Sequence, residues 1–253
     1  TGDAYLLELS GGTWVVKQKL FPTGNSSNAK YGASVAIDGN HAVVAAPLWY
    51  SSSSSSPEGA IFIFEPSGNT WVWTDRFIGP SGTSYLGHGV AIKGDYIVAG
   101  MPMVESYDGR CRIYKKTNNT WALSQTIASN PVYTDSKFGY FVNFDTQTDN
   151  NRFVVSGTHR HFVFEISNNT WYQTAELISS DGVDTAGAVA LYGNEIIIGA
   201  PYENASYVFE LNGNSWQQQA KLVPSDGTNN AYGGKSVAIG NSWIAMGVPG
   251  HKS

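Results

Sequence analysis

Residues 188–216 read AVALYGNEIIIGAPYENASYVFELNGNSW, with short apolar runs separated by two Gly-Asn pairs and one longer loop. Gly and Asn tolerate the positive φ that a two-residue hairpin turn of type I′ requires. The apolar runs are rich in β-branched and aromatic residues and are too short for helices. This stretch predicts three consecutive antiparallel strands, with a fourth that contains Trp216.

The same pattern occurs five times along the chain. A Trp after a tight turn marks each copy, at spacings of 57, 50, 50 and 45 residues. Four strands in each of five copies predict twenty strands and an all-β protein, and no segment has a competing helical periodicity. The repeated indoles are expected to pack inside the fold rather than stack on a ligand; they are Trp14, Trp71, Trp121, Trp171 and Trp216.

A four-stranded unit cannot bury both faces of its sheet alone, so the units are expected to stack. Radial stacking gives a five-bladed β-propeller of four-stranded antiparallel blades and protects the strand edges, whereas an open solenoid, the alternative, leaves two edges bare. Because residues 1–20 supply two strands and residues 235–253 supply two more, we expect these segments to share one closing blade. The other blades are predicted at residues 33–78, 89–127, 140–178 and 187–222 of a single domain, 1–253.

The amino-acid composition argues against several classes of protein. A hydrophobic fraction of 42% argues against general disorder, and a net charge of −5 argues against a nucleic-acid partner. The sequence contains no apolar run long enough to span a membrane, so membrane insertion is not expected. A single cysteine, Cys111, forbids a disulfide within the chain and a multi-cysteine zinc site.

Residues 31–37 (YGASVAI) and 43–47 (VVAAP) resemble the FG-GAP repeat, as do residues 138–139, 198–201 and 232–239. FG-GAP repeats form the propellers of integrin α-chains and occur in many microbial surface proteins. The resemblance covers nearly the whole chain and implies a β-propeller located outside the cell or at its surface. Integrin-type repeats often carry a DxDxDG calcium loop between the first two strands of a blade. Here four of five copies have a Gly-Asn or Gly-Asp pair instead, so no cofactor is expected and calcium is disfavoured.

Two functions are consistent with these features. The first is a non-enzymatic propeller used for adhesion, for recognition of a protein or glycan, or as a structural unit that binds copies of itself. The second is a carbohydrate-binding lectin. No nucleophile elbow, phosphate loop or HExxH motif is present, so an enzyme is not expected.

The strand order would place the tight turns on one side of the blades and every long loop on the other. Binding residues concentrate in variable loops held by a rigid scaffold, and exposed aromatics beside carboxylates can stack on sugar rings. The alternative is that these side chains merely cover the ends of the blades. The candidates on the long-loop side are Trp49, Tyr50, Tyr107, Asp108, Tyr133, Tyr202 and Glu203.

Metal and glycan sites are less strongly indicated. Asp145 and Asp149 lie where the calcium loop of the family would be, but the third acid and the glycine are missing. His159 and His161 form an H-x-H pair, for which a structural role is favoured over a metal site. Asn-x-Ser/Thr sequons, which would carry glycans in an extracellular protein, occur at Asn25, Asn118, Asn168 and Asn204.

Overall fold

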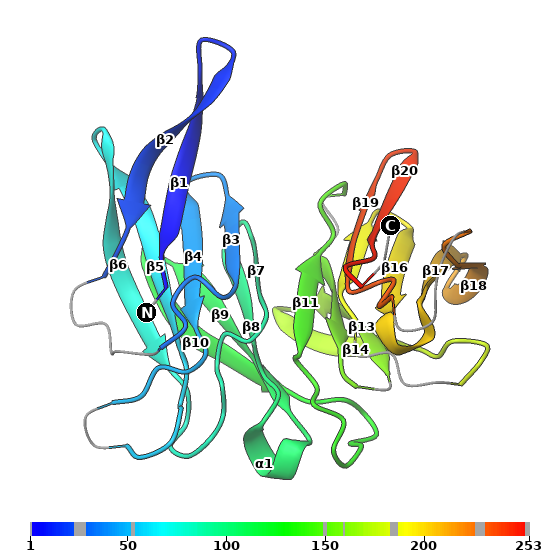
Figure 1. Ribbon diagram of the computed structural model, residues 1–253. Helices are drawn as coiled ribbons and strands as arrows, with labels where there is room; N and C mark the ends of the chain where they lie inside the picture. The colour runs from blue at the N-terminus through cyan, green and yellow to red at the C-terminus, as the bar shows by residue number, and fades with distance from the viewer. Residues whose placement is uncertain are drawn as a thin grey trace. The chain divides into compact units, whose positions relative to one another are not determined.

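The computed structural model describes residues 2–22, 29–51, 54–148, 151–158, 160–182, 187–225 and 231–250. These residues form the predicted twenty β-strands, together with a short turn of helix, α1 (Val104–Tyr107), and a 3-10 turn, η1 (Pro201–Glu203) (Figure 1). The all-β prediction is therefore confirmed. No helix in the described ranges is both long and apolar enough to cross a membrane.

The chain divides into two compact units, which are described separately. Unit 1 comprises residues 1–104 and 111–126, and unit 2 comprises residues 105–110 and 127–253. Unit 1 holds one two-stranded and two four-stranded sheets. Its strands are β1 (Ala4–Ser10), β2 (Thr13–Leu20), β3 (Val35–Asp38), β4 (His41–Ala46), β5 (Ala60–Ser67), β6 (Thr70–Ile78), β7 (Val90–Lys93), β8 (Tyr96–Met101), β9 (Arg110–Thr117) and β10 (Thr120–Ile127).

Unit 2 holds two four-stranded sheets and one two-stranded sheet. Its strands are β11 (Phe141–Phe144), β12 (Arg152–Ser156), β13 (His161–Ser167), β14 (Thr170–Leu177), β15 (Val189–Tyr192), β16 (Glu195–Ala200), β17 (Ala205–Asn212), β18 (Ser215–Leu222), β19 (Ser236–Gly240) and β20 (Trp243–Gly247).

All four of the four-stranded sheets are antiparallel meanders in which neighbours in sequence are neighbours in the sheet, as predicted for propeller blades. The hairpins β1–β2 and β19–β20 are separate two-stranded sheets, so the shared closing blade and the ring of five stay predictions. The Gly-Asn pattern of the repeats predicts a tight turn at Gly240 and Asn241, but Gly240 pairs with Trp243, so Asn241 and Ser242 occupy the turn.

The glycine of the Tyr/Phe-Gly motif, which follows Leu86 instead of an aromatic residue in the second repeat, has a structural explanation. Gly87 has a φ of 89°, and a Cβ atom there would lie 2.8 Å from the Cβ of Ala45. Its N–H donates a hydrogen bond to the carbonyl of Gly100 at 2.9 Å, and Gly32 makes the matching bond to Ala45 at 2.9 Å. Only glycine combines this backbone conformation with so close an approach, which explains why the motif recurs.

The outer hairpins share a β-bulge at one position of the repeat. The register shifts between Leu6 and Leu7 in β1, and at the matching place in β5, β13 and β17. The extra residue in the partner strand is Lys17 in β2 and Thr174 in β14, three residues after the repeated Trp. A bulge therefore redirects side chains at the same place in these four repeats.

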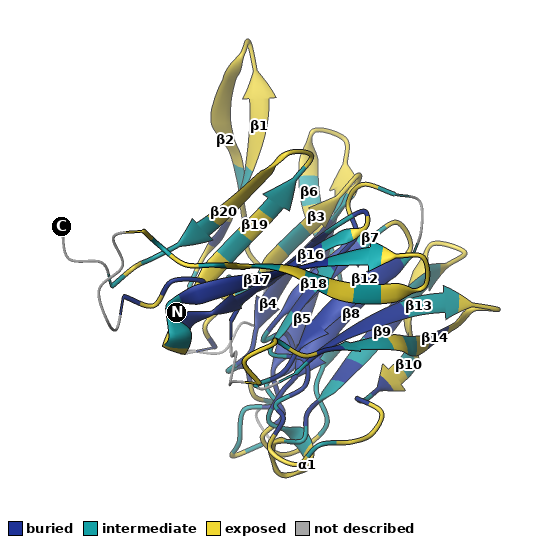
Figure 2. Ribbon diagram, turned by 90° about the vertical axis from the view of Figure 1, so that its right-hand side faces the viewer, coloured by how far each residue is buried: buried dark blue, intermediate teal, exposed yellow. Residues whose placement is uncertain are grey.

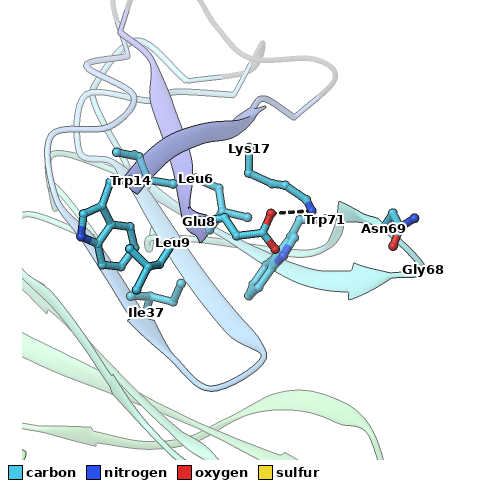
Figure 3. A pocket seen from close by; sticks show the side chains of 10 residues that line it. Leu6, Glu8, Leu9, Trp14, Lys17, Ile37, Gly68, Asn69 and Trp71 are labelled. Atoms are coloured by element: carbon cyan, nitrogen blue, oxygen red, sulfur yellow. Dashed lines mark hydrogen bonds and ion pairs between the residues drawn. The ribbon is translucent and has the colours of Figure 1, made fainter. Parts of the chain in front are cut away.

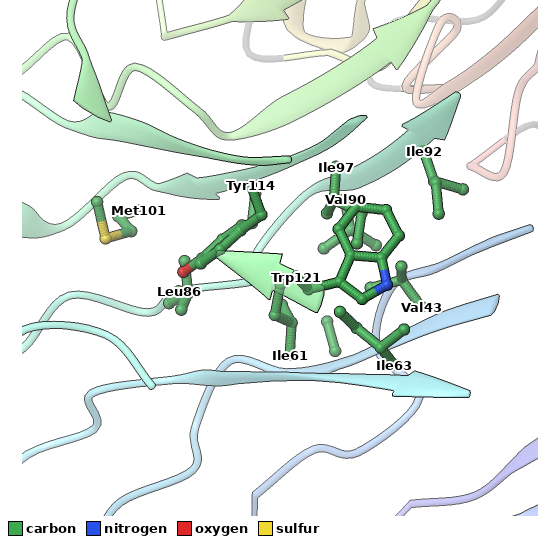
Figure 4. Close-up of a cluster of buried hydrophobic side chains, with 12 residues drawn as sticks. Val43, Ile61, Ile63, Leu86, Val90, Ile92, Ile97, Met101, Tyr114 and Trp121 are labelled. Carbon is green, nitrogen blue, oxygen red and sulfur yellow. The ribbon is translucent and has the colours of Figure 1, made fainter. Parts of the chain in front are cut away.

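The core lies between the sheets of each unit. In unit 1, side chains of β4, β5, β7 and β8 enclose Tyr114 and Trp121, both almost fully buried (Figure 4). In unit 2, Trp171 is 2% exposed and packs on Phe153, with ring centroids 4.7 Å apart. The packing role predicted for the repeated Trp is confirmed for these two indoles.

Two of the other repeated indoles, Trp71 and Trp216, are half-buried, and Trp14 is 66% exposed. Most of the β1–β2 hairpin is also exposed (Figure 2). Val35 in β3 is 60% exposed, whereas Val90, at the same position of the next repeat, is 6% exposed because β7 packs beside β3. Unit 1 therefore has an uncovered apolar face on β1, β2 and β3.

Candidate functional site

Trp49, the first candidate of the long-loop side, is buried. It is 5% exposed and packs into the apolar cluster around Phe62. The guanidinium of Arg76 lies 5.0 Å from its ring centroid. The expectation that this indole is exposed on a loop is wrong, because the loop folds back and the ring becomes part of the core.

Three further candidates keep exposed or half-exposed rings. Tyr50 is 40% exposed and Tyr107 is 50% exposed. Tyr133 is held by Arg160, whose guanidinium lies 4.1 Å from the ring centroid, and its hydroxyl donates to Glu176 at 3.1 Å.

Asp108 has a role in its own loop, because its Oδ1 accepts a hydrogen bond from the backbone N–H of Asp135 at 3.2 Å. This carboxylate ties together two of the long loops of unit 2. This hydrogen bond gives one of the two carboxylate oxygens of Asp108 a partner within the protein, so no ligand is needed to explain that oxygen.

Tyr202 and Glu203 lie together at η1 in unit 2. The Tyr202 ring is 74% exposed, and its centroid lies 6.4 Å from that of Tyr232 in an edge-to-face arrangement. The Glu203 carboxylate accepts a short hydrogen bond from the hydroxyl of Tyr207 and lies 3.7 Å from the Nζ of Lys221. A hydrogen bond from Lys221 also lowers the pKa of Asp181. Two exposed tyrosine rings therefore lie beside a network of charged groups.

The position of the family's calcium loop is occupied by an internal cap. Asp145 is fully buried, and its Oδ1 accepts from the backbone N–H groups of Gln147 at 2.9 Å and Gly193 at 2.8 Å. Its Oδ2 accepts a short bond from the hydroxyl of Thr148. Asp149 lies outside the described residues. Within the described ranges, no group of three or more His, Cys, Asp or Glu could hold a metal ion.

His161 is buried inside unit 2, and burial lowers the pKa of its imidazole to about 3. His159, its partner in the H-x-H pair, lies outside the described residues. A fully buried ring with so low a pKa is uncharged at neutral pH, which fits the structural role favoured from the sequence.

We expect this histidine to make the protein less stable in mild acid. The imidazole takes up a proton near pH 6.5 in the unfolded chain but only near pH 3 in the folded one, so stability falls as the pH drops below 6.5. Between pH 7 and pH 5 the loss of unfolding free energy is about 2 kcal/mol, measurable by urea denaturation. The variant His161→Cys should lose this dependence, and Cys is chosen because Cys111 occupies the matching position of the preceding repeat. An unchanged slope would assign the dependence to other groups.

The sequons differ in their surroundings. Asn118 and Asn168 are exposed at the tips of tight turns, where they have φ values of 51° and 50°. Asn204 is half-buried, and its Oδ1 accepts a hydrogen bond from the N–H of Gly233 at 2.7 Å. Asn25 lies outside the described residues.

The sequence reasoning missed a set of side chains on the tight-turn side. In unit 2, a pocket of 320 Å³ is lined by Arg152, Glu165, Thr174, Leu211, Gly213, Asn214 and Trp216. Arg152 donates from Nε to Glu165 at 2.7 Å and from Nη1 to the carbonyl of Gly193 at 3.3 Å. Its guanidinium lies 5.5 Å from the centroid of the Trp216 ring. We call this the seam pocket of unit 2, because it lies where the outer hairpins of two adjacent sheets meet.

A related pocket of 330 Å³ occurs in unit 1, where Glu8 pairs with Lys17 at 2.8 Å beside Trp71 (Figure 3). Gly68 and Asn69 line it, just as Gly213 and Asn214 line the seam pocket of unit 2. The signal was present in the sequence: a Glu precedes the repeated Trp by six residues in four of the five copies.

The seam between the two four-stranded sheets of unit 1 has the same residue types but no such opening. The Nε1 of Trp121 donates to Glu65 at 3.0 Å, and Lys116 donates to the same carboxylate at 2.8 Å. Partial burial raises the pKa of Glu65 and these two hydrogen bonds lower it, with a net shift downward. Because Trp121 is only 3% exposed, its indole fills the space that is open beside Trp216.

Comparison with known proteins agrees with this architecture. The model of a family described as FG-GAP repeat matches residues 14–64 and 216–253. No curated protein sequence matches significantly. The crystal structure of a protein from Lactobacillus plantarum has a TM-score of 0.58 and 12% sequence identity, over 88% of this chain and 64% of that one. This chain thus spans less than two thirds of that protein, and the likeness concerns the fold. The matched repeats, the likeness of fold and the four-stranded sheets together support an FG-GAP repeat protein of the β-propeller type.

Proposed function

We propose that the chain is a non-enzymatic recognition module outside the cell or at its surface, used in adhesion or in a surface assembly, and that it works without a cofactor. FG-GAP repeats are typical of extracellular proteins, which supports the location. The partner is a protein or a glycan that binds the long loops. A lectin acting through the same loops is the second candidate, favoured by the carboxylates beside Tyr202.

The observation that carries the proposal is the pair of exposed tyrosine rings in unit 2. Tyr202 is 74% exposed and lies on the connection between β16 and β17 of one sheet, whereas Tyr232 is 42% exposed and lies on the connection from β18 to β19. Tyrosine offers a large contact area at a low cost in conformational entropy and is enriched among residues that dominate binding energy. Two adjacent exposed rings therefore suit the anchoring of a partner.

The scaffold we propose is the closed ring of five blades. In the sheet β15–β18, Ile196 pairs with Phe209 and Ile197 pairs with Val208. Aligning the repeats on their Trp and Pro residues places Ile244 opposite Leu7 and Ala245 opposite Leu6 in a joint sheet β19–β20–β1–β2. This pairing would give the backbone groups at the free edges of β20 and β1 hydrogen-bond partners, and it would cover the apolar face of β1, β2 and β3.

The proposed binding role predicts a selective loss of affinity. Replacing Tyr202 and Tyr232 together by Ala should weaken binding to a partner found on arrays of extracellular proteins and glycans by about ten-fold or more. The melting temperature should change little, because neither ring is part of the buried core.

The matched control is Asn40→Ala with Asn241→Ala, two exposed positions on tight turns. It should leave the affinity for the same partner unchanged. If the control weakens binding and the tyrosine variant does not, the partner contacts the tight-turn side and the proposal fails.

A further inference from the structure

We propose that the seam pocket of unit 2 binds a pyranose sugar. This site lies on the tight-turn side of the sheets and is independent of the function proposed for the long loops. Its three chemical components are the half-buried indole of Trp216, the carboxylate of Glu165 and the guanidinium of Arg152. Each of them suits a different part of a sugar ring.

Trp216 provides an apolar surface for the C–H face of the sugar. Its ring is fixed, because it packs against the core of unit 2 and lies 5.5 Å from the Arg152 guanidinium. A ring held in place before binding loses little entropy when a ligand stacks on it.

Glu165 and Arg152 provide an acceptor and a donor for hydroxyl groups. The Glu165 side chain is 34% exposed, so its carboxylate is accessible from the pocket. The Arg152 side chain is only 9% exposed and uses Nε and Nη1 for protein partners. Among the described residues Nη2 has no partner, which leaves a donor for a ligand. Hydrogen bonds to charged groups are stronger than those between neutral groups.

The pairing of the two charges favours a neutral ligand. The Nε atom of Arg152 lies 2.7 Å from the Oε1 atom of Glu165, so each side chain largely compensates the charge of the other. An anionic or cationic ligand therefore gains little net attraction. A volume of 320 Å³ lies at the lower end of the range for small-molecule sites and suits one sugar ring. A neutral ligand rich in hydroxyl groups with one apolar face matches these constraints best.

The recurrence of this arrangement supports a built site rather than accidental packing. In unit 1, an acid, a cation and an indole again lie together, as Glu8, Lys17 and Trp71. The cation, Lys17, is the bulge residue of β2. The same three residue types meet a third time, as Glu65, Lys116 and Trp121. There the indole is buried and fills the space between the two sheets. The seam around Trp121 therefore has the same residue types without an open pocket, and a substitution there can serve as a control for one in the seam pocket of unit 2.

Titration of the intact protein with neutral monosaccharides (glucose, galactose, mannose and fucose), followed by saturation-transfer NMR and calorimetry, tests the proposal. At least one sugar should bind, and Glu165→Gln should weaken that binding about ten-fold or more. Glu65→Gln removes the matching carboxylate of the seam around Trp121 and should leave the affinity unchanged.

Three results would overturn the proposal. The first is no binding by the intact protein up to about 10 mM sugar, a weaker interaction than a functional site would show. The second is an equal loss in Glu165→Gln and Glu65→Gln, which would indicate a general effect on the fold. The third is sugar binding that persists in Glu165→Gln but disappears in the Tyr202→Ala, Tyr232→Ala variant. That result would place the sugar on the long loops and support the lectin form of the proposed function.

Discussion

Deletion of residues 1–20 is expected to abolish cooperative unfolding. The deletion removes β1 and β2, which in the proposed ring supply half of the closing blade. It would leave β20 with an unpaired edge and expose the apolar residues of β3 permanently, including Val35 and Ile37. We expect a broad thermal transition and a tendency to aggregate, since both features promote association between chains. A truncated chain with the melting curve of the intact protein would rule out closure through this hairpin.

A disulfide can test the same closure without loss of a strand. The proposed register brings Leu6 and Ala245 opposite each other, so Leu6→Cys with Ala245→Cys should oxidise within one chain. Leu6→Cys with Ile244→Cys is the control, because adjacent strand residues point to opposite faces of the sheet. Cys111 should not interfere, since it is fully buried and burial raises the pKa of its thiol. A crosslink only between different chains would indicate exchange of hairpins rather than a closed monomer.

The strands and most tight turns could be predicted because local chemistry determines them. Asn118 and Asn119 have φ values of 51° and 62°, as required by the turn inferred from their residue types. The turn after β19 was misplaced because Gly240 precedes an Asn-Ser pair that serves the turn equally well. Closure stays a prediction, because it depends on pairing between distant segments rather than on local preference.

Prediction of the candidate site was less successful, because burial of a side chain depends on packing that the sequence does not display. Trp49 looked like a loop aromatic but lies in the core. Asp145, only a weak calcium candidate from the sequence, accepts hydrogen bonds from its own loop and from Gly193. The seam pocket was not predicted, because the candidates were chosen from the long loops and the pocket lies on the side of the tight turns. Arg152 and Trp216, which are 64 residues apart (216 minus 152), meet only in the folded sheets.

Trp171→Ala should be the most destabilising single change among the repeated Trp positions. The indole is 2% exposed and contacts Phe144 and Phe153, with ring centroids 5.9 Å and 4.7 Å away. Removing it leaves a cavity beside the rings of Phe144 and Phe153, which are held by the other strands of the same sheet. The expected loss is about 3–5 kcal/mol of unfolding free energy, measured by urea denaturation.

The neighbouring residue provides the matched control for that measurement. Tyr172 lies next to Trp171 on β14 but is 46% exposed, so Tyr172→Ala removes an aromatic ring from the same strand without opening a cavity. Its cost should stay below about 1 kcal/mol. Equal losses for the two variants would show that strand propensity, rather than burial, decides the effect. Trp171 would then contribute to the hairpin itself and not to the packing of the buried rings.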